Sequence, residues 1–170
     1  MNDFHIIIPA RYDSVRLPGK ALIDIAGRPM IQWVHQCALK SGAASVTVAT
    51  DDERIVKCCE AFGAAVVMTS PDHPSGTDRI AECARNLGLD DTALIVNLQG
   101  DEPLTPPAAL ITVATALAAC DGAQISTLCA PITSASGSSA PMEEILSFAM
   151  THWVAASKKK AWSTVRGPAP

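Results

Sequence analysis

The chain has 170 residues, 48% of them hydrophobic, few aromatic residues and a formal net charge of −4. This length fits one domain with a sizeable core, and the hydrophobic content excludes a disordered chain. The negative balance gives no reason to expect a nucleic-acid partner, so the cations matter locally rather than over the whole surface.

The sequence contains neither an evident export signal nor an evident membrane span. Residues 1–3 carry no cationic side chain, and the apolar run after them is too short for a signal peptide. The longest largely apolar stretch, residues 108–120, is too short to cross a bilayer. The six cysteines lack C-x-x-C spacing, which indicates buried thiols rather than metal ligands or disulfides: Cys37, Cys58, Cys59, Cys83, Cys120 and Cys129. We therefore expect a cytoplasmic protein without a membrane partner.

The first predicted element is an apolar strand over residues 4–8, which ends at Pro9. The loop after it carries three cations, Arg11, Arg16 and Lys20. Ligands of open α/β sheets bind at the carboxyl ends of the strands, and both Arg and Lys bind phosphate oxygens. The loop therefore favours a polyanion such as a nucleoside triphosphate, and a solvated cationic loop is the alternative that charge alone leaves open. Neither G-x-x-x-x-G-K-[ST] nor G-x-G-x-x-G is present.

The chain then alternates between helical and extended patterns as far as residue 132. After an extended piece over residues 21–25, strands are predicted at 45–49, 65–68, 93–98 and 125–132. Helices are predicted over 29–40, from Asp51 or Asp52 to Phe62, from Thr77 or Asp78 to Leu87, and from Pro106 onward. This alternation predicts right-handed βαβ crossovers, and hence the α/β class with a mostly parallel sheet and flanking helices.

Two motifs adjoin these predicted elements. Gln99-Gly100-Asp101 follows a strand that is apolar enough to be buried on both faces, so Asp101 emerges at the carboxyl edge of the sheet. A carboxylate there can hold Mg²⁺ against phosphate oxygens, and a turn that Asp101 merely caps is the equal alternative. Ser75, before the helix that begins near Thr77, is a candidate helix cap.

Four collinear motifs resemble those of the sugar nucleotidyltransferases, specifically the CMP-KDO synthetases (3-deoxy-manno-octulosonate cytidylyltransferases). They are Ile7-Ile8-Pro9-Ala10-Arg11 through Arg16-Leu17-Pro18-Gly19-Lys20, Val48-Ala49-Thr50-Asp51-Asp52, His73-Pro74-Ser75-Gly76-Thr77-Asp78-Arg79 and Val96-Asn97-Leu98-Gln99-Gly100-Asp101-Glu102-Pro103. The resemblance covers residues 1 to about 132. It implies a Rossmann-like fold of the glycosyltransferase-A type. It also implies transfer of CMP from CTP to the anomeric hydroxyl of 3-deoxy-manno-octulosonate (KDO), which yields CMP-KDO and pyrophosphate for lipopolysaccharide synthesis.

The resemblance also implies roles for single residues. Arg11 and Lys20 are the expected catalytic residues that hold the phosphates, with Arg16 as a helper or, alternatively, a surface ion-pair partner. Gln99 is expected to bind the sugar acid, and Asp101 to bind Mg²⁺, the implied cofactor. His73 is expected to form loop hydrogen bonds rather than to act as a base. The whole expected nucleotide-binding set is Ala10, Arg11, Ser14, Arg16, Lys20, Ser75, Gly76 and Thr77.

The sequence departs from the family pattern after about residue 133. Residues 133–141 have the Ser/Ala/Gly/Pro-rich composition of a linker, residues 142–157 can form an amphipathic helix, and residues 158–170 read as a solvated end. No family motif is matched there, so we expect a nucleotide-binding domain over residues 1–133 and a divergent, poorly ordered tail over residues 134–170. We also expect a truncated chain with an incomplete homodimer interface. The alternatives are a CMP-sialic acid synthetase and a non-catalytic nucleotide-binding fragment.

Overall fold

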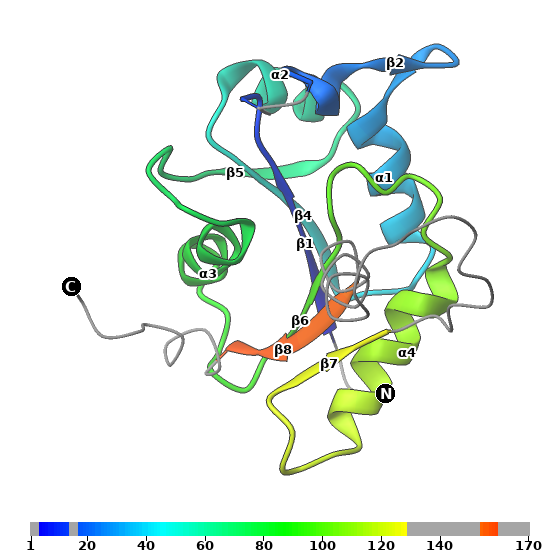
Figure 1. The fold of residues 1–170 in the computed structure, drawn as a ribbon, viewed down its shortest axis with the longest axis vertical. Helices are drawn as coiled ribbons and strands as arrows, with labels where there is room; N and C mark the ends of the chain where they lie inside the picture. Colours follow the sequence, from blue (N-terminus) through cyan, green and yellow to red (C-terminus); the bar gives the residue numbers. More distant parts are fainter. Residues whose placement is uncertain (1–3, 14–16, 129–153, 160–170) are drawn as a thin grey trace, which may run out of the picture.

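A six-stranded sheet forms the centre of the molecule (Figure 1). The computed structural model describes residues 4–13, 17–128 and 154–159. Four strands are parallel: β1 (Phe4–Ala10), β4 (Ser45–Thr50), β5 (Ala65–Met68) and β6 (Leu94–Asn97). The strand order is β5-β4-β1-β6-β8-β7, in which β8 (Ala155–Lys158) is antiparallel to β6, and β7 (Ile125–Thr127) is antiparallel to β8. The α/β class and the mostly parallel sheet are confirmed.

Helices cover both faces of the sheet, as the alternating pattern predicts. The helices are α1 (Met30–Leu39), α2 (Glu53–Ala61), α3 (Gly76–Asn86) and α4 (Pro107–Ala118). Successive side chains of β1 point to opposite faces, so Ile6 and Ile8 pack in the larger core cluster with α1, α2 and α4. Ile7 packs in the smaller cluster with α3, beside Ile80 and Ile95. All three isoleucines of β1 are fully buried, which makes β1 the central strand of the core.

Several helix ends follow the predicted local signals. The Asp52 carboxylate caps α2 by accepting the Arg54 amide at 2.8 Å, and Gly63 adopts a left-handed φ of 77° just after the helix. Ser75 caps α3 by accepting the Asp78 amide, and Pro106 precedes an α4 that has proline in its first turn. These ends confirm the predictions for the three helices to within about two residues.

The extended piece predicted over residues 21–25 is wrong at its start, residues 21 and 22, and right over residues 23–25. A 3-10 turn, η1 (Lys20–Leu22), comes first, and a small hairpin follows from β2 (Asp24–Ile25) and β3 (Arg28–Pro29). Ala26 and Gly27 form its two-residue turn with φ of 53° and 84°, and the Asp24 carboxylate accepts the Gly27 amide. Left-handed φ at both central positions matches the twist of paired strands, which explains why the chain turns back here.

The helix predicted over residues 142–157 is wrong at its end, because residues 155–158 form β8 between β6 and β7. Residues 129–153 and 160–170, with Cys129 and most of the predicted tail, lie outside the described residues. The described piece of that tail is a sheet strand, and Val154 and Ala156 are buried. The domain boundary at residue 133 stays a prediction.

The expectation of buried thiols holds for three of the described cysteines. Cys37, Cys59 and Cys83 are buried, and burial raises the pKa of both Cys59 and Cys83 to about 12, so these two thiols stay protonated at neutral pH. Cys120 is exposed and Cys58 is half-buried, which the sequence pattern did not distinguish.

Within the described segments, no helix has the length and apolar character needed to cross a membrane.

Candidate functional site: a cleft at the switch point of the sheet

The candidate site lies where the order of the parallel strands reverses. The chain runs from β1 outward to β4 and β5 on one side, and then returns to add β6 on the other side of β1. The loops after β1 and β6 therefore diverge and leave a crevice at their carboxyl ends, which is the usual ligand position in such folds. A cleft of about 270 Å³ lies there, lined by Pro9, Ala10, Arg11, Asp13, Lys20, Ala21, Gly76, Gln99, Gly100 and Asp101.

The structure brings together most of the site residues that the sequence predicts. Six of them line the cleft: Ala10, Arg11, Lys20, Gly76, Gln99 and Asp101. Ser75 and Thr77 flank Gly76 at the start of α3. Ser14 and Arg16 lie outside the described residues. Asp13 lines the cleft as well, although no motif singled it out.

The floor of the cleft is formed by close contact between the β1 end and Gly100. A Cβ atom added to Gly100 would lie 3.0 Å from the Pro9 carbonyl oxygen and 3.4 Å from the Ala10 Cβ. The first of these atoms belongs to the backbone of the central strand and cannot move aside cheaply. The absent side chain of Gly100 therefore lets the loop after β6 lie close against the end of β1.

Lys20 and Asp101 face each other across the cleft. The Lys20 Nζ lies 2.6 Å from Asp101 Oδ2, and the two side chains are 37% and 36% exposed. An ion pair this exposed contributes little to folding stability, because water screens both charges. The pair can therefore open in favour of a ligand. Sequence reasoning proposed a role for each residue but not their direct contact.

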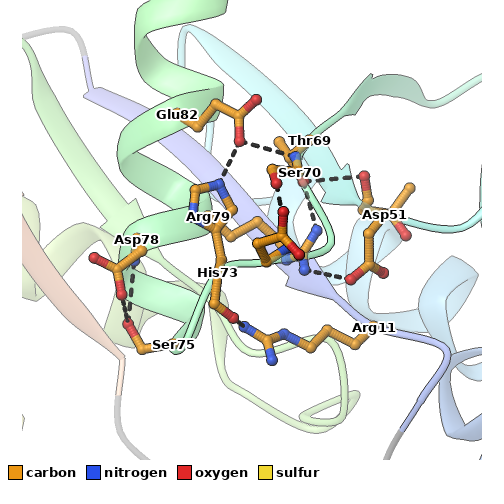
Figure 2. Close-up of polar contacts among 11 residues, drawn as sticks. Arg11, Asp51, Thr69, Ser70, His73, Ser75, Asp78, Arg79 and Glu82 are labelled. Carbon is orange, nitrogen blue, oxygen red and sulfur yellow. Dashed lines mark hydrogen bonds and ion pairs between the residues drawn. The ribbon is translucent and has the colours of Figure 1, made fainter.

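The guanidinium of Arg11 is held by a loop far away in sequence. Its Nη2 donates a hydrogen bond to the backbone carbonyl of His73, in the segment between β5 and α3 (Figure 2). His73 thus acts as a loop hydrogen-bonding residue, as the sequence predicts. Its imidazole Nε2 contacts Glu82 Oε2 on α3, and the same oxygen accepts the Ser70 amide at 2.9 Å. The Ser70 amide and then the His73 side chain hold the pKa of Glu82 below its usual range.

A buried arginine connects the same loop to the end of β4. The Arg79 side chain is fully buried, and its Nη2 lies 2.5 Å from Asp51 Oδ2. Its Nη1 donates to Thr69 Oγ1, which in turn donates to the Thr50 carbonyl at 3.0 Å (Figure 2). The sequence offered Asp51 only as an alternative to Asp52 for the cap of α2, a place that Asp52 takes, and it gave the Arg79 side chain no role. The structure shows that Asp51 and Arg79 form one ion pair between two of the motifs.

The cationic loop after β1 is anchored on its other side by α2. The Arg54 guanidinium stacks 3.2 Å from the centre of the Tyr12 ring and makes two hydrogen bonds to the Asp52 carboxylate. The Gly19 amide donates to the Tyr12 carbonyl at 2.8 Å, and Gly19 has a left-handed φ of 70°. These contacts fix the position of Tyr12 at one end of the loop and of Lys20 at the other.

Sequence comparison assigns the chain to a family. A family model described as cytidylyltransferase matches residues 5–147, which is most of the chain. This chain belongs to the cytidylyltransferase family. The match extends past residue 133, where we placed the domain boundary.

Two curated relatives of this cytidylyltransferase family member carry the same name. The 3-deoxy-manno-octulosonate cytidylyltransferase of Coxiella burnetii is 59% identical over 131 residues, which cover 77% of this chain and 53% of that protein. The protein of the same name from Pseudomonas fluorescens is 57% identical over 129 residues, or 76% and 51% of the two chains. The chain thus spans about half the length of the curated relatives it matches.

Solved structures agree with this assignment. A CMP:2-keto-3-deoxy-manno-octonic acid synthetase in complex with CTP superposes with a TM-score of 0.75 at 31% identity, covering 98% of this chain and 80% of the other. A 4-diphosphocytidyl-2C-methyl-D-erythritol synthase superposes with a TM-score of 0.66 at 14% identity, over 98% and 81%. The second likeness concerns the fold alone. Together they confirm the predicted Rossmann-like nucleotidyltransferase architecture.

Proposed function

We propose that this chain binds CTP in the cleft between the ends of β1 and β6, in the service of CMP transfer to the anomeric hydroxyl of KDO. Pyrophosphate is the second product, and CMP-KDO is used for lipopolysaccharide synthesis in the cytoplasm. The observation that carries the proposal is the convergence of Arg11, Lys20 and Asp101 on one cleft at the switch point. The identity of 59% to a protein named for this reaction supports the choice of KDO.

The proposed role of the two cations is to bind and orient the triphosphate. Phosphoryl-type transfer depends mostly on positioning and on stabilising developing negative charge, and the nucleophile here is the hydroxyl of the sugar acid. Arg11 offers a planar fork of donors from one wall of the cleft, and Lys20 a point charge from another. Lys20 exchanges Asp101 for phosphate, and this exchange costs little because more than a third of each side chain is exposed to water.

Asp101 is the proposed ligand of Mg²⁺. The chemistry of the cleft fits this ion, because Asp101 and Asp13 both line it and Mg²⁺ binds a few carboxylates together with phosphate oxygens and water. In the described part of the chain no three His, Cys, Asp or Glu residues gather closely enough to hold a metal by themselves. A bound Mg²⁺ would neutralise charge on the triphosphate. Asp101 supplies the carboxylate at the β6 side of the cleft.

The remaining proposed contacts concern the base and the sugar. The Ser75-Gly76-Thr77 segment begins α3 at the wall of the cleft, where backbone amides can bind the cytidine. Ala10 lies on the floor, and Gln99, whose Nε2 donates to Asn97 Oδ1, is the proposed ligand of the sugar acid. Ser14 and Arg16 complete the proposed nucleotide set by family resemblance. We expect the active form of the full-length relatives to be a homodimer.

A second candidate function is CTP binding without turnover. It is favoured by residues 133–170, in which we matched no sugar-binding motif. Rate acceleration requires both reactants in near-attack geometry. We therefore expect slow pyrophosphate release or none. A rate on the order of 1–10³ s⁻¹ would exclude this candidate.

The test of the main proposal compares Arg11→Ala and Lys20→Ala with Lys57→Ala, which removes an exposed cation from α2. Each cleft variant is expected to lose about 1.5–3 kcal/mol of CTP binding energy, because one charge-assisted phosphate contact disappears. Calorimetric titration with CTP measures this, and circular dichroism verifies the fold. Unchanged affinity in both cleft variants would remove the phosphate role. Pyrophosphate release with CTP plus either KDO or a sialic acid distinguishes the two sugar acids.

A further inference from the structure

Helix α3 makes several contacts with the loop between β5 and α3. Three side chains of α3 reach back to it: Asp78 to Ser75, Arg79 to Thr69, and Glu82 to both Ser70 and His73 (Figure 2). Their contacts are spread from the beginning of the loop to its end. The loop carries the His73 carbonyl that accepts a hydrogen bond from Arg11.

Glu82 occupies the centre of this arrangement. Its Oε2 accepts the Ser70 amide at 2.9 Å and contacts His73 Nε2, so one oxygen fixes two points of the loop. The side chains of His73 and Glu82 are only 17% and 23% exposed. Because the Ser70 amide and His73 favour the carboxylate form, Glu82 holds the loop as an anion.

We propose that Glu82 is a positioning residue for Arg11. It acts through His73, whose side chain it anchors and whose carbonyl orients the guanidinium at the cleft. An arginine side chain loses considerable rotamer freedom when it binds a ligand, and a preformed orientation reduces that cost. Arg79 supports the same loop by donating a hydrogen bond to Thr69. The ion pair with Asp51 holds the Arg79 guanidinium in place. The inference rests on the proposed function of the cleft as a CTP site.

A purely structural role for Glu82 makes a different prediction from a positioning role. If Glu82 only stabilises α3 and its loop, replacing it changes the unfolding midpoint and weakens CTP binding by the same factor whether or not Arg11 is present. If it orients Arg11, its contribution to CTP binding depends on the guanidinium. A double-mutant cycle between the two residues separates these cases.

The experiment measures CTP affinity by calorimetry in the wild-type chain, Glu82→Gln, Arg11→Ala and the double variant. Glu60→Gln on α2 is the matched control, because it also neutralises a helix carboxylate and is exposed. We expect Glu82→Gln to weaken CTP binding about tenfold, no further loss when it is added to Arg11→Ala, and no effect of Glu60→Gln. A second variant, His73→Phe, keeps the backbone carbonyl but removes the imidazole contact. It should show the same coupling, and it replaces Glu82→Gln if that variant does not fold.

The outcomes separate this inference from the proposed function. If Arg11→Ala weakens CTP binding and neither Glu82→Gln nor His73→Phe does, the positioning role is wrong and the CTP site stands. Equal losses with and without Arg11 would also overturn it, in favour of a structural role. If the wild-type chain does not bind CTP, or Arg11→Ala binds it normally, the proposed function fails first and the inference fails with it.

Discussion

At the scale of single residues, Lys20 and Asp101 form an ion pair with each other. We propose phosphate as the ligand of Lys20 and Mg²⁺ as the ligand of Asp101. Each side chain neutralises the other in this contact, so opposite charges lie together at the cleft. Binding of triphosphate with Mg²⁺ would offer both charges stronger partners, since phosphate oxygens attract the lysine and the cation attracts the carboxylate. The contact is therefore an exchangeable one in our proposal, and removal of Asp101 should affect binding through the metal.

We predict that Asp101→Asn weakens CTP binding in the presence of Mg²⁺ more than in its absence. The amide keeps the shape of the side chain but loses the charge that attracts the metal, and it frees Lys20 for phosphate. Titrations of CTP with and without Mg²⁺ measure the difference. Asp121→Asn is the control, because Asp121 is exposed and its carbonyl contacts Lys158 near the start of β6, away from the carboxyl ends of the strands. Identical metal dependence in Asp101→Asn and wild type would make Asp101 a turn residue only.

At the scale of elements, Gly100 allows the loop after β6 to lie against the end of β1. Gly100 lies against the carbonyl of Pro9 at the end of β1, so the turn brings Gln99 and Asp101 next to Ala10 and Arg11. A larger side chain would require the end of β1 or the loop to shift by a few tenths of an ångström. The resulting strain falls on the same contact that forms the cleft floor, so stability and nucleotide binding should change together.

We predict that Gly100→Ala destabilises the fold by about 1–3 kcal/mol and weakens CTP binding, as expected for overpacking against backbone. Gly122→Ala is the matched control, because nothing lies within 4 Å of its added Cβ. Chemical denaturation and CTP titration of both variants provide the measurements. Normal stability and affinity in Gly100→Ala would show that β1 and the loop can separate at little cost.

At the scale of the whole molecule, the sheet depends on a strand that is distant in sequence. β8 pairs with β6 on one side and with β7 on the other, so it separates two strands that precede it in the chain. Ala156 at its centre is fully buried, and Lys159 beyond it donates to the Leu89 carbonyl before β6. Residues 155–158 therefore pack as an inner strand of the sheet.

We predict that a chain ending at residue 133 is less stable than the whole chain and prone to association. Loss of β8 leaves the outer edge of β6 without its antiparallel partner and uncovers apolar surface. A chain ending at residue 159 is the control, since it retains β8. Thermal unfolding and light scattering compare the three chains. A stable, monomeric 1–133 chain would show that β8 is dispensable and would support the boundary predicted at residue 133.

Much of the fold follows from signals that act over a few residues. The strand at residues 65–68 lies where the sequence predicts it, and Asp52, Ser75 and Pro106 mark the starts of their helices, because caps and prolines act on neighbouring backbone groups. The cationic loop and the Gln99-Gly100-Asp101 motif were placed at the cleft edge by the rule for carboxyl ends of parallel strands. The sequence by itself determined these elements, because each signal lies within the element it defines.

Tertiary structure alone decided the contacts between those elements. The sequence Ala155-Ala156-Ser157-Lys158 has little intrinsic preference for strand, and it is extended because β6 and β7 both offer it backbone partners. Likewise, nothing near Arg11 indicates the His73 carbonyl, and nothing near Asp51 indicates Arg79, 28 residues away. Such pairs depend on which loops the sheet order brings together. Long-range backbone pairing and the burial of one arginine thus complete a site whose separate parts were already visible in the sequence.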